Sequence, residues 1–512
     1  MSKTIQTLDT AIVGGGITGL YACDLLHEKN GASYKTALFE SSDRFGGRIE
    51  TIEMDGFLAE YGPMRFEKRA QPLLMKLIRD SGLETTHFSP YLPATDPEAL
   101  MNLAEDENRG SDEKPFNALE ILTLGILRIL RLSGGDFNDP RDPRHREWWA
   151  GLDEPFYQKV RTEITFRGQP LHQIGFRNIL SMVLSEKAIR KIIHYGTFYH
   201  VVHYNPNAAE WINFWLRGLH PKEELVGIKQ GTQALVTELV KKLSSPKAGK
   251  EPPALHLHHR LMAVYPADEN RVRLEFETAE RNKVEILARH LVLAIPQSPL
   301  KSLSSFFPDH IGQWIDSVIP VPLVKCFFVT SRPWWNADTK PQTRASSTPT
   351  RELHYYCRKE GSGKRGMVMV YGEPPSMHYW TPFVKNNRHL NAEINEDVRL
   401  LDYYVKYLAT DPGADALQKK EELQAITCFG IRDWSREPFG AGCHIWKPGV
   451  RADEAIDQLT NFSLPGAPGG VKNIHICGEA YSDFQGFIEG GLRMARQVVA
   501  LQSAADEGGH RD

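Results

Sequence analysis

The sequence predicts an α/β fold whose main domain is assembled from segments far apart in the chain. Near the N-terminus, a strand-like run, a glycine-rich turn and a helix-like run follow one another. A fully apolar run over 291–296 has the character of a buried parallel strand. The last segment has a strand-like run over 473–477, then glycine, then a helical pattern from about Ile488. Together these pieces indicate a doubly wound, Rossmann-like domain.

The N-terminal turn carries a dinucleotide-binding pattern. Gly14 permits a tight turn, Gly16 lets a pyrophosphate approach the backbone, and Gly19 lets helix and strand pack closely. Glu40 ends the next strand, 21 positions after Gly19. A carboxylate there can accept both ribose hydroxyls of an adenosine and would repel a 2′-phosphate. The pattern therefore predicts FAD or NAD rather than NADP.

Length and composition limit the number of domains, the kinds of partner and the location that we expect. The 512 residues suffice for roughly three domain-sized units. Hydrophobic residues make up 41% and charged residues 24%, which is ordinary for a globular protein. A net charge of −3 gives no electrostatic reason to expect a nucleic-acid partner. The six cysteines form no CxxC pair and the N-terminus has no apolar leader, so we expect a reducing, cytoplasmic location.

One apolar stretch and one histidine cluster bear on membranes and metals. Residues 118–132 are too short to span a bilayer and include three charged side chains. We expect a packed helix there, with a helix on a membrane surface as the alternative. His256, His258 and His259 lack a nearby carboxylate or cysteine that would complete a metal site. We therefore predict neither a membrane span nor a metal.

Three units are predicted from the order of the patterns. Helical patterns follow a polar loop over 90–115, and strand patterns return from 255. The predicted units are a dinucleotide-binding domain over 1–70, 224–320 and 426–512, a mixed-sheet substrate-binding domain over 71–115 and 321–425, and an inserted helical domain over 116–223.

Several short motifs occur in a fixed order along the chain. They are Gly14-x-Gly16-x-x-Gly19 with Glu40, Gly46-Gly47-Arg48, Gly62-Pro63-Met64-Arg65, Val292 to Pro296, Val324-Lys325-Cys326, Trp434 to Pro438, and Gly478-Glu479 followed by Gly486 to Gly490. In this order they resemble the flavin-dependent amine oxidases, and within them the L-amino acid oxidases, over nearly the whole chain. The resemblance implies FAD, a doubly wound FAD-binding domain, a mixed-sheet substrate-binding domain and a helical domain that shapes the access funnel.

Two arginines are predicted to bind anions. Arg48 follows two glycines in a loop directed at the cofactor, so its guanidinium can pair with phosphate oxygens. Arg65 can hold a carboxylate through two parallel hydrogen bonds, which would distinguish an amino acid from an amine and fix its Cα over the flavin. The resemblance implies this anchoring role for Arg65, and an ion pair within its loop is the structural alternative.

Strand residues are expected to add further groups. Lys325 interrupts an apolar strand, so its charge must find a partner or its proton is lost. The resemblance implies that Lys325 holds a water against flavin N5, which could assist reoxidation by dioxygen. The resemblance also implies a tyrosine beside the substrate carboxylate. Tyr355 and Tyr356 are the candidates, alternation places only one of them on the pocket face, and we favour Tyr355.

The C-terminal motifs are expected to surround the flavin ring. The resemblance implies that the Gly486 carbonyl accepts a hydrogen bond from the substrate amine. The helix start near Ile488 would direct its N–H groups at the flavin N1–C2=O edge. Phe487 and Trp434 are expected to form apolar walls, and Glu479 to hydrogen-bond the ribityl chain.

The segment over 440–444 raises the question of covalent attachment. It resembles the segment where monoamine oxidases attach FAD through a cysteine, which is Cys443 here. His444 stands where that family has a cage tyrosine. Because Arg65 belongs to the signature of enzymes that hold FAD without a covalent bond, we favour non-covalent FAD.

The predicted site residues fall into three groups. The predicted catalytic groups are Lys325, Arg65 and Tyr355. The predicted substrate contacts are Arg65, Tyr355, Tyr356, His444, Gly486 and Phe487. The predicted cofactor contacts are Gly14, Gly16, Thr18, Gly19, Glu40, Gly47, Arg48, Gly62, Met64, Arg65, Leu261, Trp434, Gly478, Glu479, Phe487 and Ile488.

These expectations combine into one reaction. The sequence predicts an FAD-dependent L-amino acid oxidase that uses dioxygen and releases a 2-oxo acid, ammonia and hydrogen peroxide. The alternatives are an amine or polyamine oxidase and a decarboxylating amino acid monooxygenase of the same family. The side-chain preference and the oligomeric state stay open, with a homodimer among the options.

Overall fold

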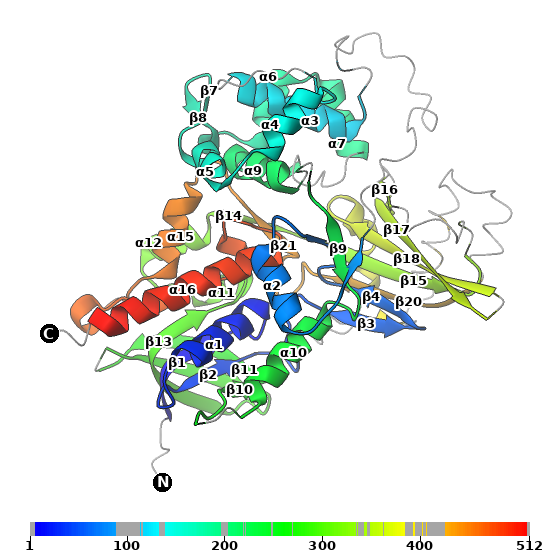
Figure 1. Cartoon of the computed structure of the whole chain (residues 1–512). Helices are drawn as coiled ribbons and strands as arrows, with labels where there is room; N and C mark the ends of the chain where they lie inside the picture. The colour runs from blue at the N-terminus through cyan, green and yellow to red at the C-terminus, as the bar shows by residue number, and fades with distance from the viewer. Residues whose placement is uncertain are drawn as a thin grey trace.

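A computed structural model describes most of the chain (Figure 1). The described residues are 6–88, Glu113, 116–132, 139–195, 203–218, His220, 222–246, 249–268, 270–333, Trp335, 343–345, 349–361, 363–384, 393–394, Asp402, Lys406 and 425–508. Apart from Glu113, the loop expected over 90–115 lies outside the described residues.

Among the described residues, the largest sheet has seven strands, in the order β10-β2-β1-β13-β12-β11, with β22 paired to β13. β1 pairs in parallel with β2 and β13, whereas β11 and β12 are antiparallel, so the sheet is mixed. The strands expected near 291–296 and 473–477 are confirmed as parts of β13 and β22, which pair in parallel. The bounds are β1 (Gln6–Val13), β2 (Thr36–Phe39), β10 (Ala254–His256), β11 (His259–Pro266), β12 (Val272–Thr278), β13 (Lys283–Leu293) and β22 (Ile474–Ile476).

Helices from distant parts of the chain cover this sheet. α1 (Ile17–Lys29) lies between α10 (Gln233–Ser244) and α16 (Ile488–Gly508), and α2 (Pro72–Asp80) packs on α16 (Figure 1). The apolar side chains of these helices share one core with β1, where Ala11 and Ile12 are fully buried. The remaining helices of this core are α11 (Gln297–Leu303), α12 (Asp309–Ile315) and α15 (Ala452–Thr460).

A second sheet lies beside the first, in the order β16-β17-β18-β15-β20-β19. All its named strand pairs are antiparallel, so the mixed pairing expected here belongs to the larger sheet instead. β17 and β18 form a hairpin, and a hairpin can only pair antiparallel. The bounds are β15 (Val324–Thr330), β16 (Thr343–Ala345), β17 (Glu352–Glu360), β18 (Gly363–Gly372), β19 (Glu393–Ile394) and β20 (Ile426–Asp433).

Helices dominate the region predicted as an inserted helical domain (Figure 1). The apolar stretch over 118–132 forms α3, which packs against α6 and α7, so the expected packed helix is confirmed. Asp142 and Asp153 cap the starts of α4 and α5 by accepting backbone N–H groups. Within the described residues, no helix is long and apolar enough to cross a bilayer. The bounds are α3 (Ala118–Leu132), α4 (Pro143–Ala150), α5 (Glu154–Thr162), α6 (Phe176–Val183), α7 (Glu186–Tyr195) and α9 (Ala208–Gly218).

Short strands and single-turn helices join these units. The strands pair as β3 with β4, β14 with β21, β7 with β8, and β9 between β5 and β6. Their bounds are β3 (Thr51–Met54), β4 (Phe57–Glu60), β5 (Phe66–Glu67), β6 (Thr85–His87), β7 (Thr165–Phe166), β8 (Gln169–Pro170), β9 (Leu225–Ile228), β14 (Val318–Val321) and β21 (Cys443–Trp446). The single-turn helices are Leu171–Gln173, Ser304–Phe306, Ser376–Tyr379, Thr381–Phe383, Pro468–Gly470 and Glu479–Tyr481.

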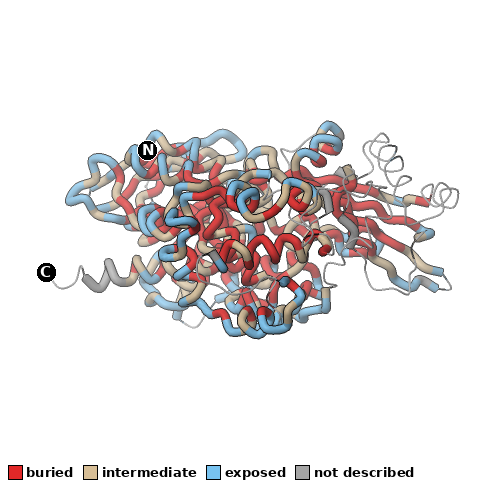
Figure 2. Tube along the Cα trace, turned by 90° about the horizontal axis from the view of Figure 1, so that it is seen from above, coloured by how far each residue is buried: buried red, intermediate tan, exposed pale blue. Residues whose placement is uncertain are grey.

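Burial follows this arrangement of layers. Figure 2 shows buried segments through the interior and exposed residues on the outer loops. The α2 side chains Leu74, Leu77 and Ile78 lie in the core of the large sheet rather than against the second sheet. The domain boundaries given above stay a prediction.

Candidate functional site

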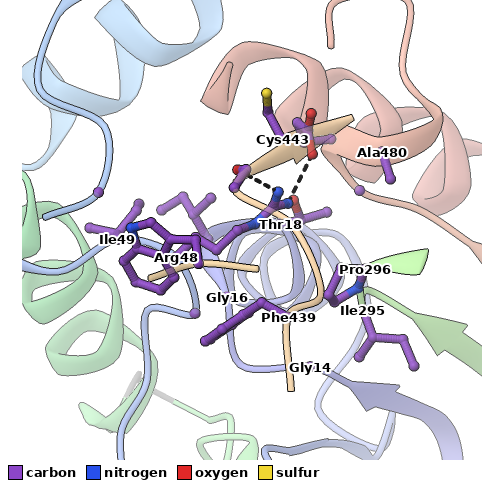
Figure 3. Close-up of a pocket in the computed structure, with 18 of the residues that line it drawn as sticks. Gly14, Gly16, Thr18, Arg48, Ile49, Ile295, Pro296, Phe439, Cys443 and Ala480 are labelled. Carbon is purple, nitrogen blue, oxygen red and sulfur yellow. Dashed lines mark hydrogen bonds and ion pairs between the residues drawn. The ribbon is translucent and has the colours of Figure 1, made fainter. Parts of the chain in front are cut away.

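One cavity of about 920 Å³ opens between the large sheet, the second sheet and α9. Such a volume lies at the upper end of the range for cofactor and ligand pockets. Its wall combines the turn after β1, the loop over 40–49, the segment over 61–66, strands β15, β18 and β21, and the segment over 478–491. Figure 3 shows the part of the wall around the turn after β1.

At one end of the cavity, glycines form an open cradle. Gly14 has a φ of 109°, and a Cβ there would overlap the carbonyl oxygen of Ala294. Gly16 precedes α1, and a Cβ on it would find no heavy atom nearer than Gly47 Cα at 4.0 Å. The first amides of α1 therefore face this end of the cavity, as an anion site requires. Gly19 does not line the cavity; a Cβ on it would overlap the Gly14 carbonyl oxygen, as its predicted packing role requires.

Glu40 lies on the wall at the carboxyl end of β2. Its Oε2 accepts the Gly15 amide at 2.6 Å, and its Oε1 accepts the Ser42 amide and hydroxyl, each at 2.8 Å. These bonds fix the carboxylate beside the cradle. Its predicted contact with the ribose stays a prediction.

Arg48 is held by the C-terminal part of the site (Figure 3). Its guanidinium donates to the Gly442 carbonyl at 2.9 Å and pairs with Glu479 Oε2 at 2.9 Å. Glu479 also accepts the backbone amide of His444 and its Nδ1, at 2.9 and 3.0 Å. Burial raises the pKa of Glu479, but Arg48 and His444 outweigh this effect and lower it to about 2. Arg48 and Glu479 therefore form an ionised pair on the wall.

Lys325 is a buried lysine on β15 that lines the cavity. Its Nζ donates to the backbone carbonyls of Glu60 at 2.9 Å and Gly62 at 2.5 Å. It lies 5.2 Å from the centre of the Tyr371 ring. Burial lowers the pKa of Lys325 to about 7 and raises that of Glu60 to about 7, although each opposes the other's shift. The expectation that this charge must find partners or lose its proton is confirmed.

Arg65 lies on the cavity wall just before β5. Its Nη1 lies 3.1 Å from Glu352 Oε1, and the two side chains are 11% and 6% exposed. The same oxygen lies 2.6 Å from His354 Nε2. Burial raises the pKa of Glu352, but Arg65 and His354 outweigh this effect and lower it to about 2. The ion pair named as the structural alternative is thus present, and its partner comes from a distant strand.

The expectation that Tyr355 faces the pocket is wrong. Tyr355 is buried in the apolar core on the other face of the second sheet, with its ring 5.1 Å from that of Trp335. Residues alternate along β17, so Tyr356 shares a face with Glu352, although it does not line the cavity. Among the described residues, the tyrosines that line the cavity are Tyr61 and Tyr371. Tyr371 of β18 pairs across the sheet with both Glu352 and Lys325.

Aromatic side chains form the wall toward the helical region. Phe487 stacks on Phe214 of α9 with ring centres 5.5 Å apart, and Phe214 stacks on Trp211 at 4.2 Å. Trp434 is 3% exposed and donates to the Tyr61 carbonyl at 2.8 Å. The helical contribution was not predicted residue by residue, because no local pattern shows which α9 side chains face the cavity.

The other predicted residues lie at the following places. Gly486 precedes α16, with its amide donating to Glu479 Oε1 at 2.8 Å. Cys443 lies on the wall as a free thiol that points away from the glycine turn in Figure 3. Burial raises the pKa of this thiol, which disfavours the nucleophilic thiolate. The remaining wall residues from the predicted set are Thr18, Gly47, Gly62, Met64, Leu261, His444, Gly478 and Ile488.

Histidines and acids elsewhere do not gather into a metal site. Within the residues that the structure describes, no group of three or more His, Cys, Asp or Glu side chains could hold a metal ion. His256 stacks on Phe39 with ring centres 5.0 Å apart and packs near His259.

Comparison with known proteins identifies the family. The family described as "Flavin containing amine oxidoreductase" matches residues 17–501. The chain belongs to this family. Members of this family contain a flavin. The glycine turn after β1 fits the pyrophosphate of a dinucleotide, so the cofactor of this amine oxidoreductase is FAD.

Individual relatives are more distant. Aplysianin-A from Aplysia kurodai is 22% identical over 534 residues, covering 96% of this chain and 90% of that protein. An L-amino-acid oxidase from Pseudechis australis is 36% identical over 90 residues, or 17% of each chain. Coproporphyrinogen III oxidase from Staphylococcus aureus is 36% identical over 129 residues, covering 24% of this chain and 27% of that one.

Solved structures confirm the fold. A putrescine oxidase double mutant superposes with a TM-score of 0.62 at 17% identity, covering 98% of this chain and 99% of that one. Wild-type putrescine oxidase bound to putrescine gives 0.61 at 16% identity, covering 97% and 99%. At these identities the likeness shows the shared α/β architecture, with its Rossmann-like domain, and nothing about the substrate.

Proposed function

We propose that this amine oxidoreductase is an L-amino acid oxidase. The overall reaction converts an L-amino acid, dioxygen and water into a 2-oxo acid, ammonia and hydrogen peroxide. Bound FAD would supply the redox chemistry, as acceptor of the two electrons that the substrate loses and as their donor to dioxygen. The residues of this chain bind and orient the substrate beside it.

The observation that carries the proposal is the position of Arg65. Its guanidinium lies on the cavity wall, and its charge contributes to lowering the pKa of Lys325, so both belong to one end of the cavity. A planar guanidinium matches a carboxylate and fixes its orientation. A fixed orientation raises the rate when the substrate must direct one hydrogen, here that on Cα, at the flavin. A simple amine has no group that would need Arg65.

Other wall residues have supporting roles in this proposal. The carbonyl of Gly486 receives the amino group, because it lies at the start of α16 on the same wall. Phe487, stacked on Phe214, gives an apolar surface for the substrate side chain. Tyr371, which lines the cavity where Tyr355 does not, lies beside the substrate carboxylate in this proposal.

One observation favours a second candidate, an amine oxidase. Glu352 already neutralises Arg65, so the guanidinium lacks the uncompensated charge of a free anchor. A decarboxylating monooxygenase would share the Arg65 anchor and differ in its product, since it yields an amide instead of a 2-oxo acid.

A substrate screen with one variant separates these functions. Peroxide release is measured for the twenty L-amino acids, their D-forms and common amines, and the products are identified by mass spectrometry. We expect L-amino acids to be oxidised and Arg65→Ala to lower kcat/KM by about 100-fold, since a charge-assisted bidentate contact is worth about 3 kcal/mol. The loss is calculated per bound flavin, because Arg65 is also among the predicted cofactor contacts.

Arg69→Ala is the matched control, because Arg69 is exposed and does not line the cavity. It should retain wild-type kcat/KM. Oxidation of amines alone, or undiminished turnover of amino acids by Arg65→Ala, would contradict the proposal.

A further inference from the structure

Glu352 stands directly behind the proposed anchor. It is 4% exposed and, unlike Arg65, does not line the cavity. It pairs across the sheet with Tyr371, which in turn pairs with Lys325. Glu352, Tyr371 and Lys325 are therefore neighbours across three strands at the end of the cavity near Arg65, which we call the substrate end. Glu352 lies behind the residues that line this end.

His354 fixes the Glu352 carboxylate as a charged group. Both side chains are buried, and Oε1 of Glu352 lies within hydrogen-bond distance of His354 Nε2 and Arg65 Nη1. Burial lowers the pKa of His354, so the ring is neutral at neutral pH and can donate the proton of Nε2. The three side chains together then carry one positive and one negative charge, which sum to zero.

The other charges near this end also cancel. The Glu60 carboxylate opposes the ammonium of Lys325, since each group favours the charged form of the other. Arg48 is paired with Glu479. None of these pairs offers a surplus positive charge to a second substrate carboxylate.

We propose that Glu352 is a positioning and charge-balancing residue that makes the site discriminate against acidic side chains. This inference rests on the proposed function. A zwitterionic amino acid adds no net charge, and its carboxylate meets Arg65 held in place by Glu352. A side-chain carboxylate adds a negative charge that none of these described pairs compensates, in a cavity where unpaired charge is costly. Neutral amino acids are therefore favoured over acidic ones.

L-glutamine and L-glutamate test this inference, because they have nearly the same shape and differ in charge. We expect the wild type to prefer L-glutamine by at least about tenfold in kcat/KM. Glu352→Gln keeps the shape and the hydrogen-bond acceptor but removes the charge, so it should reduce this preference by about tenfold. Glu352→Asp retains the charge and should keep most of the preference.

A binding measurement gives the same test without turnover. Dissociation constants for benzoate and benzamide are measured by titration calorimetry, with circular dichroism to show that each variant is folded. In Glu352→Gln the affinity for benzoate should rise about tenfold relative to the affinity for benzamide. Arg65→Ala should abolish any preference for benzoate.

The outcomes separate the two proposals. If benzoate binding does not depend on Arg65, both the proposed function and this inference fail. A second outcome is that benzoate binding depends on Arg65 while Glu352→Gln changes neither the glutamine-to-glutamate ratio of kcat/KM nor the benzoate-to-benzamide ratio of affinities. The same holds if Glu352→Gln weakens both compounds of each pair equally. In these cases Glu352 is only structural, and this inference alone fails. If Glu352→Gln does not fold, a wild type that oxidises L-glutamate as well as L-glutamine overturns the inference.

Discussion

The two ends of the cavity are built in different ways. The dinucleotide end is made by the backbone of a single turn, where Gly14 and Gly19 pack together and Glu40 follows on the next strand. The substrate end is made by side chains from distant segments, and the Arg65–Glu352 pair joins residues 287 positions apart. The first end depends on the absence of side chains, and the second depends on balanced charges.

The largest expected effect is at the dinucleotide end, in the glycine turn. Gly19→Val should remove bound FAD almost completely, because even its Cβ would overlap the Gly14 carbonyl oxygen and push α1 off β1. The ratio of flavin absorbance to protein absorbance should fall by at least about tenfold, which matches more than 1.4 kcal/mol of lost binding. Gly31→Ala is the control, since a Cβ there meets nothing within 4 Å. Normal flavin content in Gly19→Val would show that the turn is not the cradle.

At the substrate end, Lys325→Met separates charge from packing. Methionine fills a similar volume but removes the Nζ donor to Glu60 and Gly62. We expect the anaerobic reduction of the enzyme by substrate to change less than threefold and its reoxidation by dioxygen to slow by about tenfold or more, within the usual range for a positioned acid-base group. Stopped-flow absorbance measures both half-reactions.

Lys241→Met serves as the control, because that lysine is 72% exposed. Equal loss in both half-reactions would assign Lys325 to structure. Unchanged reoxidation would remove it from the proposed reaction.

The last prediction concerns acid stability. The pKa of Glu352 falls from 4.5 to about 2 on folding, so its stabilising contribution is complete above pH 4.5 and is lost as pH falls toward 2. Between pH 6 and pH 3 this loss is on the order of 2 kcal/mol. In Glu352→Gln the free energy of unfolding should therefore fall less over this interval, as measured by urea denaturation.

Glu224→Gln is the control for an exposed pair, because Lys68 and Glu224 are 56% and 65% exposed. Solvent screens such a pair, so this change should alter the pH dependence much less. Equal pH dependence in the wild type and Glu352→Gln would show that the buried pair is not ionised as described.

Local patterns were sufficient for the dinucleotide end and for most of the fold. The glycine turn, the carboxylate after β2 and the apolar runs of β13 and β22 each occupy a short stretch whose spacing has a direct geometric meaning. The same reasoning found that Lys325, alone in an apolar strand, needs partners.

Cross-strand register could not be read in this way. Alternation showed that Tyr355 and Tyr356 face opposite sides, but it did not show which side holds the cavity. Tyr371 reaches the wall because β18 pairs with both β15 and β17 in a definite register. Glu352 was missed for the same reason, since nothing near it in the sequence indicates that Arg65 is its partner.

The central claim is that Arg65 receives the carboxylate of the substrate. A crystal structure of the FAD-loaded protein with bound benzoate tests it most directly. We expect both carboxylate oxygens to lie within about 3 Å of the Arg65 guanidinium nitrogens, at ordinary hydrogen-bond distance. A well-ordered carboxylate elsewhere in the cavity, with Arg65 still paired only to Glu352, would contradict the account.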